Sequence, residues 1–211
     1  MRKIELIELV EDYLVGGDAP ADVKGHHHPE ILTKHVEAAY GALILQTYLE
    51  AKKFSDYSML DMFSKRFTLT VTMPGSTSYG YADLPFPIMQ LPQNASIREV
   101  IYTDDRENAF VPIEITANTV FSELEISSID NTEIYWVEKD PASNNIYKMY
   151  FDHLDDNTTE VYAKLIVPLY EFDDFDDIPF PMGREGEIFD LVVDKLRKKP
   201  QEDIINDQIA Q

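Results

Sequence analysis

The chain has 211 residues, of which 39 are aspartate or glutamate and 18 are lysine or arginine, so its formal net charge is −21. Its hydrophobic content of 44% is that of a folded chain, and the absence of cysteine excludes disulfides, zinc–thiolate sites, iron–sulfur clusters and cysteine nucleophiles. The excess of acid excludes a surface that clamps nucleic acid by neutralising phosphates, although DNA can pass an acidic surface without being held.

The N-terminal part of the chain predicts two helices with a loop between them. Residues 4–15 place apolar and acidic side chains at helical spacing, and two glycines end the segment. The acidic residues interrupt the apolar run that a signal peptide needs, and no window reaches the length of a membrane span, so we expect a soluble chain with neither feature. After a loop at 16–28, Pro29 stands where a helix favours proline, and apolar residues recur at helical spacing to about residue 53. A further short helix is expected at 57–63.

From residue 65 the hydrophobic pattern changes from helical to alternating, which indicates β-strands. After a strand that begins there, further strands are expected at 79–83, 88–91, 99–103, 109–115, 119–127, 133–138, 147–152 and 159–167. The proline-rich stretch 84–87 and Pro92 are expected to be irregular. Polar residues at 140–145 predict a hairpin and those at 155–158 another turn, and connections this short favour antiparallel strands.

The C-terminal part returns to helical spacing. The acidic run 171–177 is interpreted as a connection that leaves the sheet, and a helix is expected at 184–198. This order of elements predicts an α+β fold in which N-terminal helices and a C-terminal helix surround a mainly antiparallel β-sandwich or small barrel. We divide the chain into a helical part at 1–64, a β domain at 65–170, an acidic linker and C-terminal helix at 171–200 that pack on the helical part, and a tail at 201–211.

Four histidines form the most metal-like feature of the chain. His26, His27 and His28 are consecutive, and His35 stands one heptad after His28, so that these last two can approach one face. Adjacent histidines point in divergent directions, however, and neither an HExxH motif nor a spaced carboxylate accompanies them. We interpret them as solvated loop histidines beside a helix N-terminus and expect no metal site.

The acidic run raises the question of calcium. Its aspartates are Asp173, Asp174, Asp176 and Asp177. They lack the alternating oxygens, central glycine and terminal glutamate of an EF-hand loop. We expect a solvated acidic face instead, anchored by the interleaved Phe172 and Phe175.

Other patterns that carry chemistry are missing from the sequence. The glycines form neither GxGxxG nor GxxxxGKS/T, no serine stands in GxSxG, and His153 is the only histidine outside the N-terminal third. The many carboxylates include no pair that the sequence marks as an acid and a base. We therefore expect no catalytic residue and no cofactor, and interpret the chain as a non-catalytic interaction protein.

Aromatic residues gather in the predicted strands, where alternate positions face the core. They are Tyr79, Tyr81, Phe86, Tyr135, Trp136, Tyr147, Tyr150, Phe151 and Tyr162. Core packing accounts for most of them, and tyrosines on the opposite face suit an interface.

The order and the amino-acid sequences of several segments resemble those of a known family. The segments are PEILTKHVEAAYGALILQTYLEAKK, RFTLTVT, YADLPFPIMQLPQNASIREVIY, NAFVPIE and VYAKLIVPLYEFDDFDDIPFPMGREGEIFDLVVDKLRKKPQEDIINDQ. With the short acidic helix before them, they resemble the collar ring and head-to-tail connector proteins of tailed phages, especially those of crAss-like phages, and more loosely the podovirus tail tubular proteins. The likeness covers nearly the whole chain.

The resemblance implies a structural virion protein, located in the neck or tail after assembly in the host cytoplasm. Copies of the chain would form a closed ring, twelvefold in the family, next to the portal and other neck or tail proteins. DNA would pass through the ring without sequence-specific binding, and no membrane would be involved. Two alternatives stay open: a tail or surface module that binds a glycan or a protein through the aromatic residues, and a metal-dependent hydrolase that uses the histidines.

Overall fold

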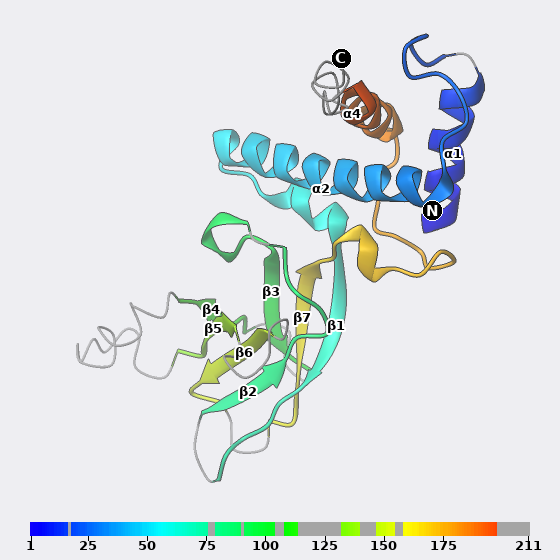
Figure 1. Cartoon of the computed structure of the whole chain (residues 1–211). Coiled ribbons are helices and arrows are strands. Elements are labelled where there is room, and N and C mark those ends of the chain that lie inside the picture. The colour runs from blue at the N-terminus through cyan, green and yellow to red at the C-terminus, as the bar shows by residue number, and fades with distance from the viewer. Residues whose placement is uncertain are drawn as a thin grey trace, which may run out of the picture. The chain divides into compact units, whose positions relative to one another are not determined.

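The computed structural model describes residues 1–16, 18–75, 79–89, 91–103, 108–113, 132–139, 147–154 and 158–197. It divides into two compact units. The β unit is Ser64–Val167, and the helical unit is formed by the chain on both sides of it, Met1–Phe63 and Pro168–Gln211. The β unit is thus inserted in the chain between the two halves of the helical unit (Figure 1).

The helical unit begins with two α-helices, α1 at Lys3–Gly16 and α2 at Pro29–Phe54. In α1, Leu6, Val10 and Leu14 recur at every fourth position, so they share one face, and all three are buried. Both helices confirm the sequence prediction.

Local signals explain where α2 starts and stops. Pro29 lies in its first turn, where the missing N–H has no intrahelical partner to lose. At its end, Ser55 adopts a left-handed conformation with a φ of 52° and donates its backbone N–H to the carbonyl of Ala51. Lys52 and Lys53 in the last turn complement the helix dipole. The buried residues of α2 are Leu32, Val36, Ala39, Tyr40, Leu43, Ile44, Thr47, Tyr48 and Ala51.

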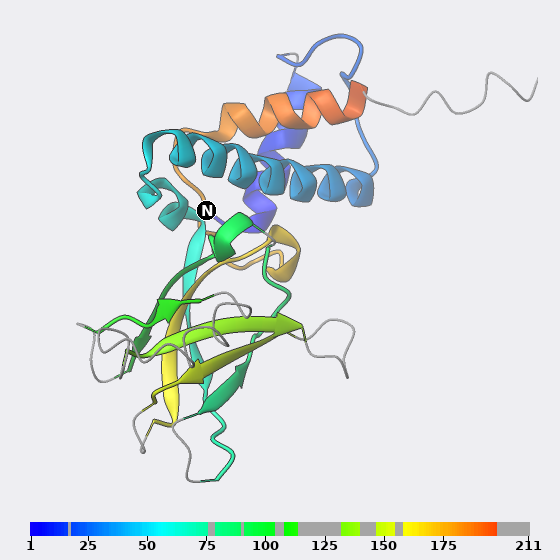
Figure 2. The same cartoon turned by 90° about the vertical axis from the view of Figure 1, so that its left-hand side faces the viewer.

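The rest of the helical unit packs against α2. Two 3₁₀ segments, η1 at Ser58–Phe63 and η3 at Leu169–Glu171, contact it, and so does helix α4 at Glu185–Arg197. Helix α4 lies alongside α2 in both views (Figures 1 and 2). The expected helix at 184–198 is therefore confirmed to within one residue at each end.

The strands of the β unit form two sheets. The first has the order β1, β7, β3, with bounds Ser64–Thr70, Glu160–Ile166 and Ile97–Tyr102. The second has the order β2, β6, β5, β4, with bounds Gly80–Asp83, Tyr147–Asp152, Ile134–Lys139 and Val111–Pro112. Among the described strands, all neighbours are antiparallel except β4 and β5, which are parallel.

The two sheets bury a shared core. Strands of the second sheet run across those of the first, as Figure 2 shows for β6 and β7. Phe110 joins the layers, because its ring lies 4.7 Å from that of Tyr102 on β3 and 5.5 Å from that of Phe151 on β6, measured between centroids. The predicted α+β fold is confirmed, and the described strands form two sheets and not a closed barrel.

Some strand predictions are corrected. The segment expected as a strand at 88–91 is irregular where it is described and leads into a 3₁₀ turn, η2 at Pro92–Asn94, because the flanking prolines cannot donate to a ladder. Of the strand expected at 109–115, only Val111–Pro112 forms within the described residues. The hairpin is confirmed, since β5 and β6 pair along their whole length. Its turn at 140–145, the strand at 119–127 and most of the turn at 155–158 lie outside the described residues.

Candidate functional site

The structure does not bring the predicted histidines together as a ligand set. His26 Nδ1 lies 3.6 Å from Glu11 Oε1, and His27 Nε2 lies 3.0 Å from the carbonyl oxygen of Val23. His28 is exposed at the start of α2, without a side-chain capping bond. Within the described part of the chain, no group of three or more histidine, aspartate and glutamate side chains is arranged to hold a metal ion.

His35 lies on α2 and is half-buried. Its burial lowers the pKa of the imidazole, and the nearby charges of Lys195 on α4 and of His27 lower it further. This histidine therefore favours its neutral form where α4 packs on α2.

The acidic loop, residues 170–177, is held in place by the N-terminus of α1. The backbone N–H of Lys3 donates to the carbonyl of Asp176 over 3.1 Å, and that of Ile4 donates to the carbonyl of Asp174 over 2.9 Å. Helix N-termini leave such N–H groups without intrahelical partners, so the loop satisfies them. The loop is consequently a fixed surface feature of the helical unit.

The two phenylalanines of this loop differ. Phe172 is buried, as predicted, but Phe175 is 73% exposed, so its expected role as an anchor was wrong. The reason is a tight turn in which the N–H of Asp173 donates to Asp176 Oδ2 and the N–H of Asp176 donates to the carbonyl of Asp173. This turn breaks the alternation of a strand and leaves Phe175 on the outside.

A buried ion pair beneath the loop was not predicted. Lys3 is 6% exposed, and its Nζ lies 3.1 Å from Glu37 Oε1 on α2 and donates to the carbonyl of Phe172 over 3.0 Å. Tyr40 of α2 adds a second link, because its hydroxyl donates to the carbonyl of Pro179 over 2.8 Å. Burial raises the pKa of Tyr40 well above its ordinary value, which keeps this hydroxyl protonated as a donor. These groups connect the returning C-terminal chain to the helices.

An apolar stripe runs along the side of α2 that faces away from its buried residues. Its members, which we call the outer face of α2, are Ile31, Ala38, Ala42, Leu45 and Leu49. Their spacing of three, four or seven residues places them on one side of the helix. Leu45 is 45% exposed and Leu49 is 51% exposed.

The charges beside the outer face are basic, although the chain as a whole is strongly acidic. Lys34, Lys52 and Lys53 lie three or four residues from stripe members and are exposed. The carboxylates of α2 lie about a quarter turn or more to the sides of the stripe: Glu30 and Glu50 are exposed, and Glu37 is paired with Lys3. Apolar side chains with basic neighbours thus distinguish this surface from the acidic character of the sequence.

The β unit carries a second distinctive surface, the aromatic face of its second sheet. Tyr81, Tyr150 and Trp136 lie in register on three adjacent strands, and Tyr79 precedes β2 on the same side. The ring centroids of Trp136 and Tyr150 are 5.6 Å apart with nearly parallel planes, and those of Tyr79 and Tyr150 are 6.0 Å apart. Cross-strand aromatic pairs of this kind stabilise a sheet.

Charged groups border the aromatic face. Trp136 Nε1 donates to Glu138 Oε1 over 2.9 Å, and Lys148 Nζ lies 5.1 Å from the ring centroid of Tyr81. Burial raises the pKa of the Tyr79 hydroxyl, and the neighbouring Tyr150, Glu138 and Asp152 raise it further. The face therefore combines stacked rings with carboxylates and one lysine ammonium.

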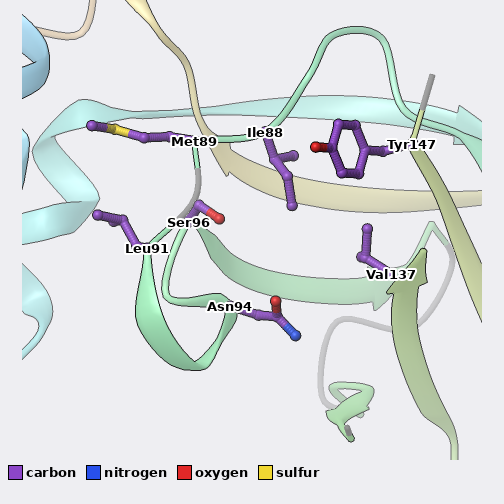
Figure 3. Close-up of a pocket in the computed structure, with 7 residues that line it drawn as sticks. All are labelled: Ile88, Met89, Leu91, Asn94, Ser96, Val137 and Tyr147. Carbon is purple, nitrogen blue, oxygen red and sulfur yellow. The ribbon is translucent and has the colours of Figure 1, made fainter. Parts of the chain in front are cut away.

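A cavity of about 230 Å³ lies elsewhere in the β unit (Figure 3). Its lining residues are Ile88, Met89, Leu91, Asn94, Ser96, Val137 and Tyr147. Ser96 Oγ has no hydrogen-bond partner among the described residues, but it is also fully buried, so a ligand in the cavity would not reach it without a rearrangement. The hydroxyl consequently does not mark a polar ligand subsite.

No protein-family model matches the chain, and no curated protein matches it. None of the described helices combines the length and apolar content needed to cross a membrane. The distinctive surfaces of the described chain are the outer face of α2, the acidic loop and the aromatic face.

Proposed function

We propose that the chain is a non-catalytic structural subunit of a phage virion, one copy in a closed ring that connects the portal to the tail and lines the DNA channel. The observation that supports this proposal best is the outer face of α2. A helix that is buried along one side and apolar along the other is typical of an element that contacts a further partner. In an assembly of identical chains, that partner is a neighbouring copy.

The net charge of −21 is consistent with this function. DNA that moves through a channel must not bind to the channel wall. An acidic wall repels the phosphates and therefore prevents such binding. The resemblance of the sequence to collar ring and connector proteins supports the virion neck as the location.

Assembly state tests the proposal. We expect the full-length protein to form a species of ring size, either alone or after addition of the portal and tail proteins of the same phage, because head-to-tail copies of one contact close into a ring. Light scattering or mass photometry measures the mass, and electron microscopy the symmetry. A strictly monomeric protein in every mixture would contradict the ring.

A second candidate function, glycan binding, is favoured by the aromatic face. The partly exposed rings of Tyr79, Tyr81 and Tyr150 offer stacking surfaces for the C–H side of a pyranose ring, whereas Trp136 is only 7% exposed and supports the face from beneath. Carboxylates such as Glu138 and Asp152 can accept hydrogen bonds from sugar hydroxyls. A tail or surface module would use such a face to hold a cell-surface saccharide.

Removing one tyrosine side chain tests whether the aromatic face binds a glycan or only stabilises the sheet. If the face binds a glycan, Tyr81→Ala should weaken binding about tenfold, as expected for a contact that dominates an interface. Tyr162→Ala, on the first sheet, serves as the control and should leave binding unchanged. A glycan array without hits for the wild-type protein would eliminate this candidate.

A further inference from the structure

We propose that neighbouring copies are joined by a head-to-tail contact in which the C-terminal half of the outer face of α2 receives the acidic loop of the next copy. The inference rests on the proposed ring, and it names the two surfaces that meet. The partner is a second copy of this chain.

The α2 side of the contact combines apolar area with positive charge. Leu45 and Leu49 stand one turn apart and are about half exposed. Lys52 and Lys53 follow within the next turn, and both are exposed. A binding partner for this surface must bring apolar side chains together with carboxylates, because a basic or purely polar surface would leave the leucines hydrated and the lysines unpaired.

The acidic loop offers that combination. Phe175 is 73% exposed and Tyr170 is 56% exposed, and both alternate with acidic residues. The exposed carboxylates of the loop belong to Glu171, Asp173, Asp174, Asp176 and Asp177. Because backbone hydrogen bonds to α1 already fix the loop, little conformational entropy is lost when a neighbour binds it.

The two surfaces lie toward opposite ends of α2, so the acidic loop cannot contact the C-terminal half of the outer face within the same copy. The loop is tied through Lys3 to Glu37, in the N-terminal half of the helix. Leu49 follows Glu37 by 12 residues, which corresponds to about 18 Å along the helix axis. In Figure 1 the loop before α4 lies near the N-terminal end of α2, away from the cyan C-terminal end. Different surfaces at opposite ends produce a heterologous contact, and such contacts close into a ring when the rotation between successive copies permits closure.

Charge reversal tests the pairing of these surfaces. One variant carries Lys52→Glu and Lys53→Glu, and the other carries Asp173→Lys and Asp174→Lys. Each variant alone should assemble only at a protein concentration about tenfold higher than the wild type needs, because like charges then face each other across the contact. An equimolar mixture should assemble again, because the two variants can alternate around the ring. The contacts are then in turn a doubly reversed pair and an unchanged wild-type pair, and both are complementary in charge. Lys24→Glu with Lys139→Glu makes the same change of net charge at exposed positions away from both surfaces and should leave assembly as in the wild type.

Site-specific cross-linking adds a measurement that does not need a stable ring. The chain has no cysteine of its own, so Leu49→Cys with Phe175→Cys introduces the only two thiols. A short bismaleimide should produce a ladder of covalent oligomers from this variant, and much less from Leu49→Cys with Asp194→Cys.

The outcomes distinguish the contact from the ring itself. If the wild type assembles and both charge variants assemble equally well, or if the two cysteine variants give equal ladders, the contact is wrong and the ring stands. If the wild type fails to assemble even with its neck partners, the ring and the contact both fall.

Discussion

Replacing Lys3 with methionine should lower the free energy of unfolding of the helical unit by about 3 kcal/mol. Lys3 Nζ contacts Glu37 Oε1 and the carbonyl of Phe172 in the interior of this unit. Without the ammonium, the carboxylate of Glu37 keeps a charge in a site that is only 22% exposed and has lost its partner. Urea denaturation followed by the far-UV circular dichroism of the helices measures the change.

Two controls show whether this loss comes from the unpaired charge. The double variant Lys3→Met with Glu37→Leu removes both charges, so it should recover most of the stability that the single variant loses. Lys24→Met removes an exposed lysine of the same unit and should change the unfolding free energy by less than about 0.5 kcal/mol. A Lys3→Met protein as stable as this surface variant would mean that the buried pair contributes nothing to folding.

The buried pair also shows what the sequence does not predict. The helical spacing around Lys3 correctly indicates α1, because that pattern is local. Its burial depends on Glu37 and Phe172, which are 34 and 169 residues away. Nothing within one turn of Lys3 distinguishes it from a solvated lysine, so this contact required the tertiary structure.

Elements with strong local signals were predicted well, and so was the one hairpin, β5 with β6, whose strands are neighbours in sequence; the pairing of strands distant in sequence was not. Pro29, the periodicity of α2 and the apolar face of α4 each specify a helix through neighbouring residues. The order β1, β7, β3 joins segments from opposite ends of the β unit, so alternation alone could not assign strands to two sheets. The apolar residues at 88–91 do not form a strand because prolines flank them, and the residues around Phe175 do not continue a strand because they form a turn.

The candidate surfaces were only partly visible in the sequence. Ile31 belongs to the apolar helical spacing that predicts α2, but it is 51% exposed and lies on the outer face. Both sides of this helix are apolar, so the periodicity of the sequence does not show which side is covered. In the structure α1, α4 and η1 pack on the side opposite the outer face. The tyrosines of the β-region were predicted as core or interface residues, and their register across β2, β6 and β5 came from the structure.

Replacing Gly80 with alanine should lower the unfolding free energy of the β unit by about 2 kcal/mol. A Cβ at this position of β2 would lie 2.7 Å from Leu154 Cδ1 and 2.9 Å from Val71 Cγ1. The tip of the leucine can shift, but the branched side chain of Val71 is held at χ1 and is itself buried, so the added methyl forces the strand or the core to move. The single tryptophan, Trp136, lies in this unit, and its fluorescence during urea denaturation reports the loss.

The same substitution at Gly186 is the matched control, and its effect on the unfolding free energy should have the opposite sign. Gly186 stands in the first turn of α4, and a Cβ there would meet nothing within 4 Å. Alanine is favoured over glycine in helices by up to about 1 kcal/mol, so Gly186→Ala should stabilise the helical unit slightly. Because both changes add one methyl group and remove one flexible residue from the unfolded chain, a difference in sign isolates the crowding around Gly80. If both variants were stabilised, the space between Val71 and Leu154 would have to be larger than the structure shows.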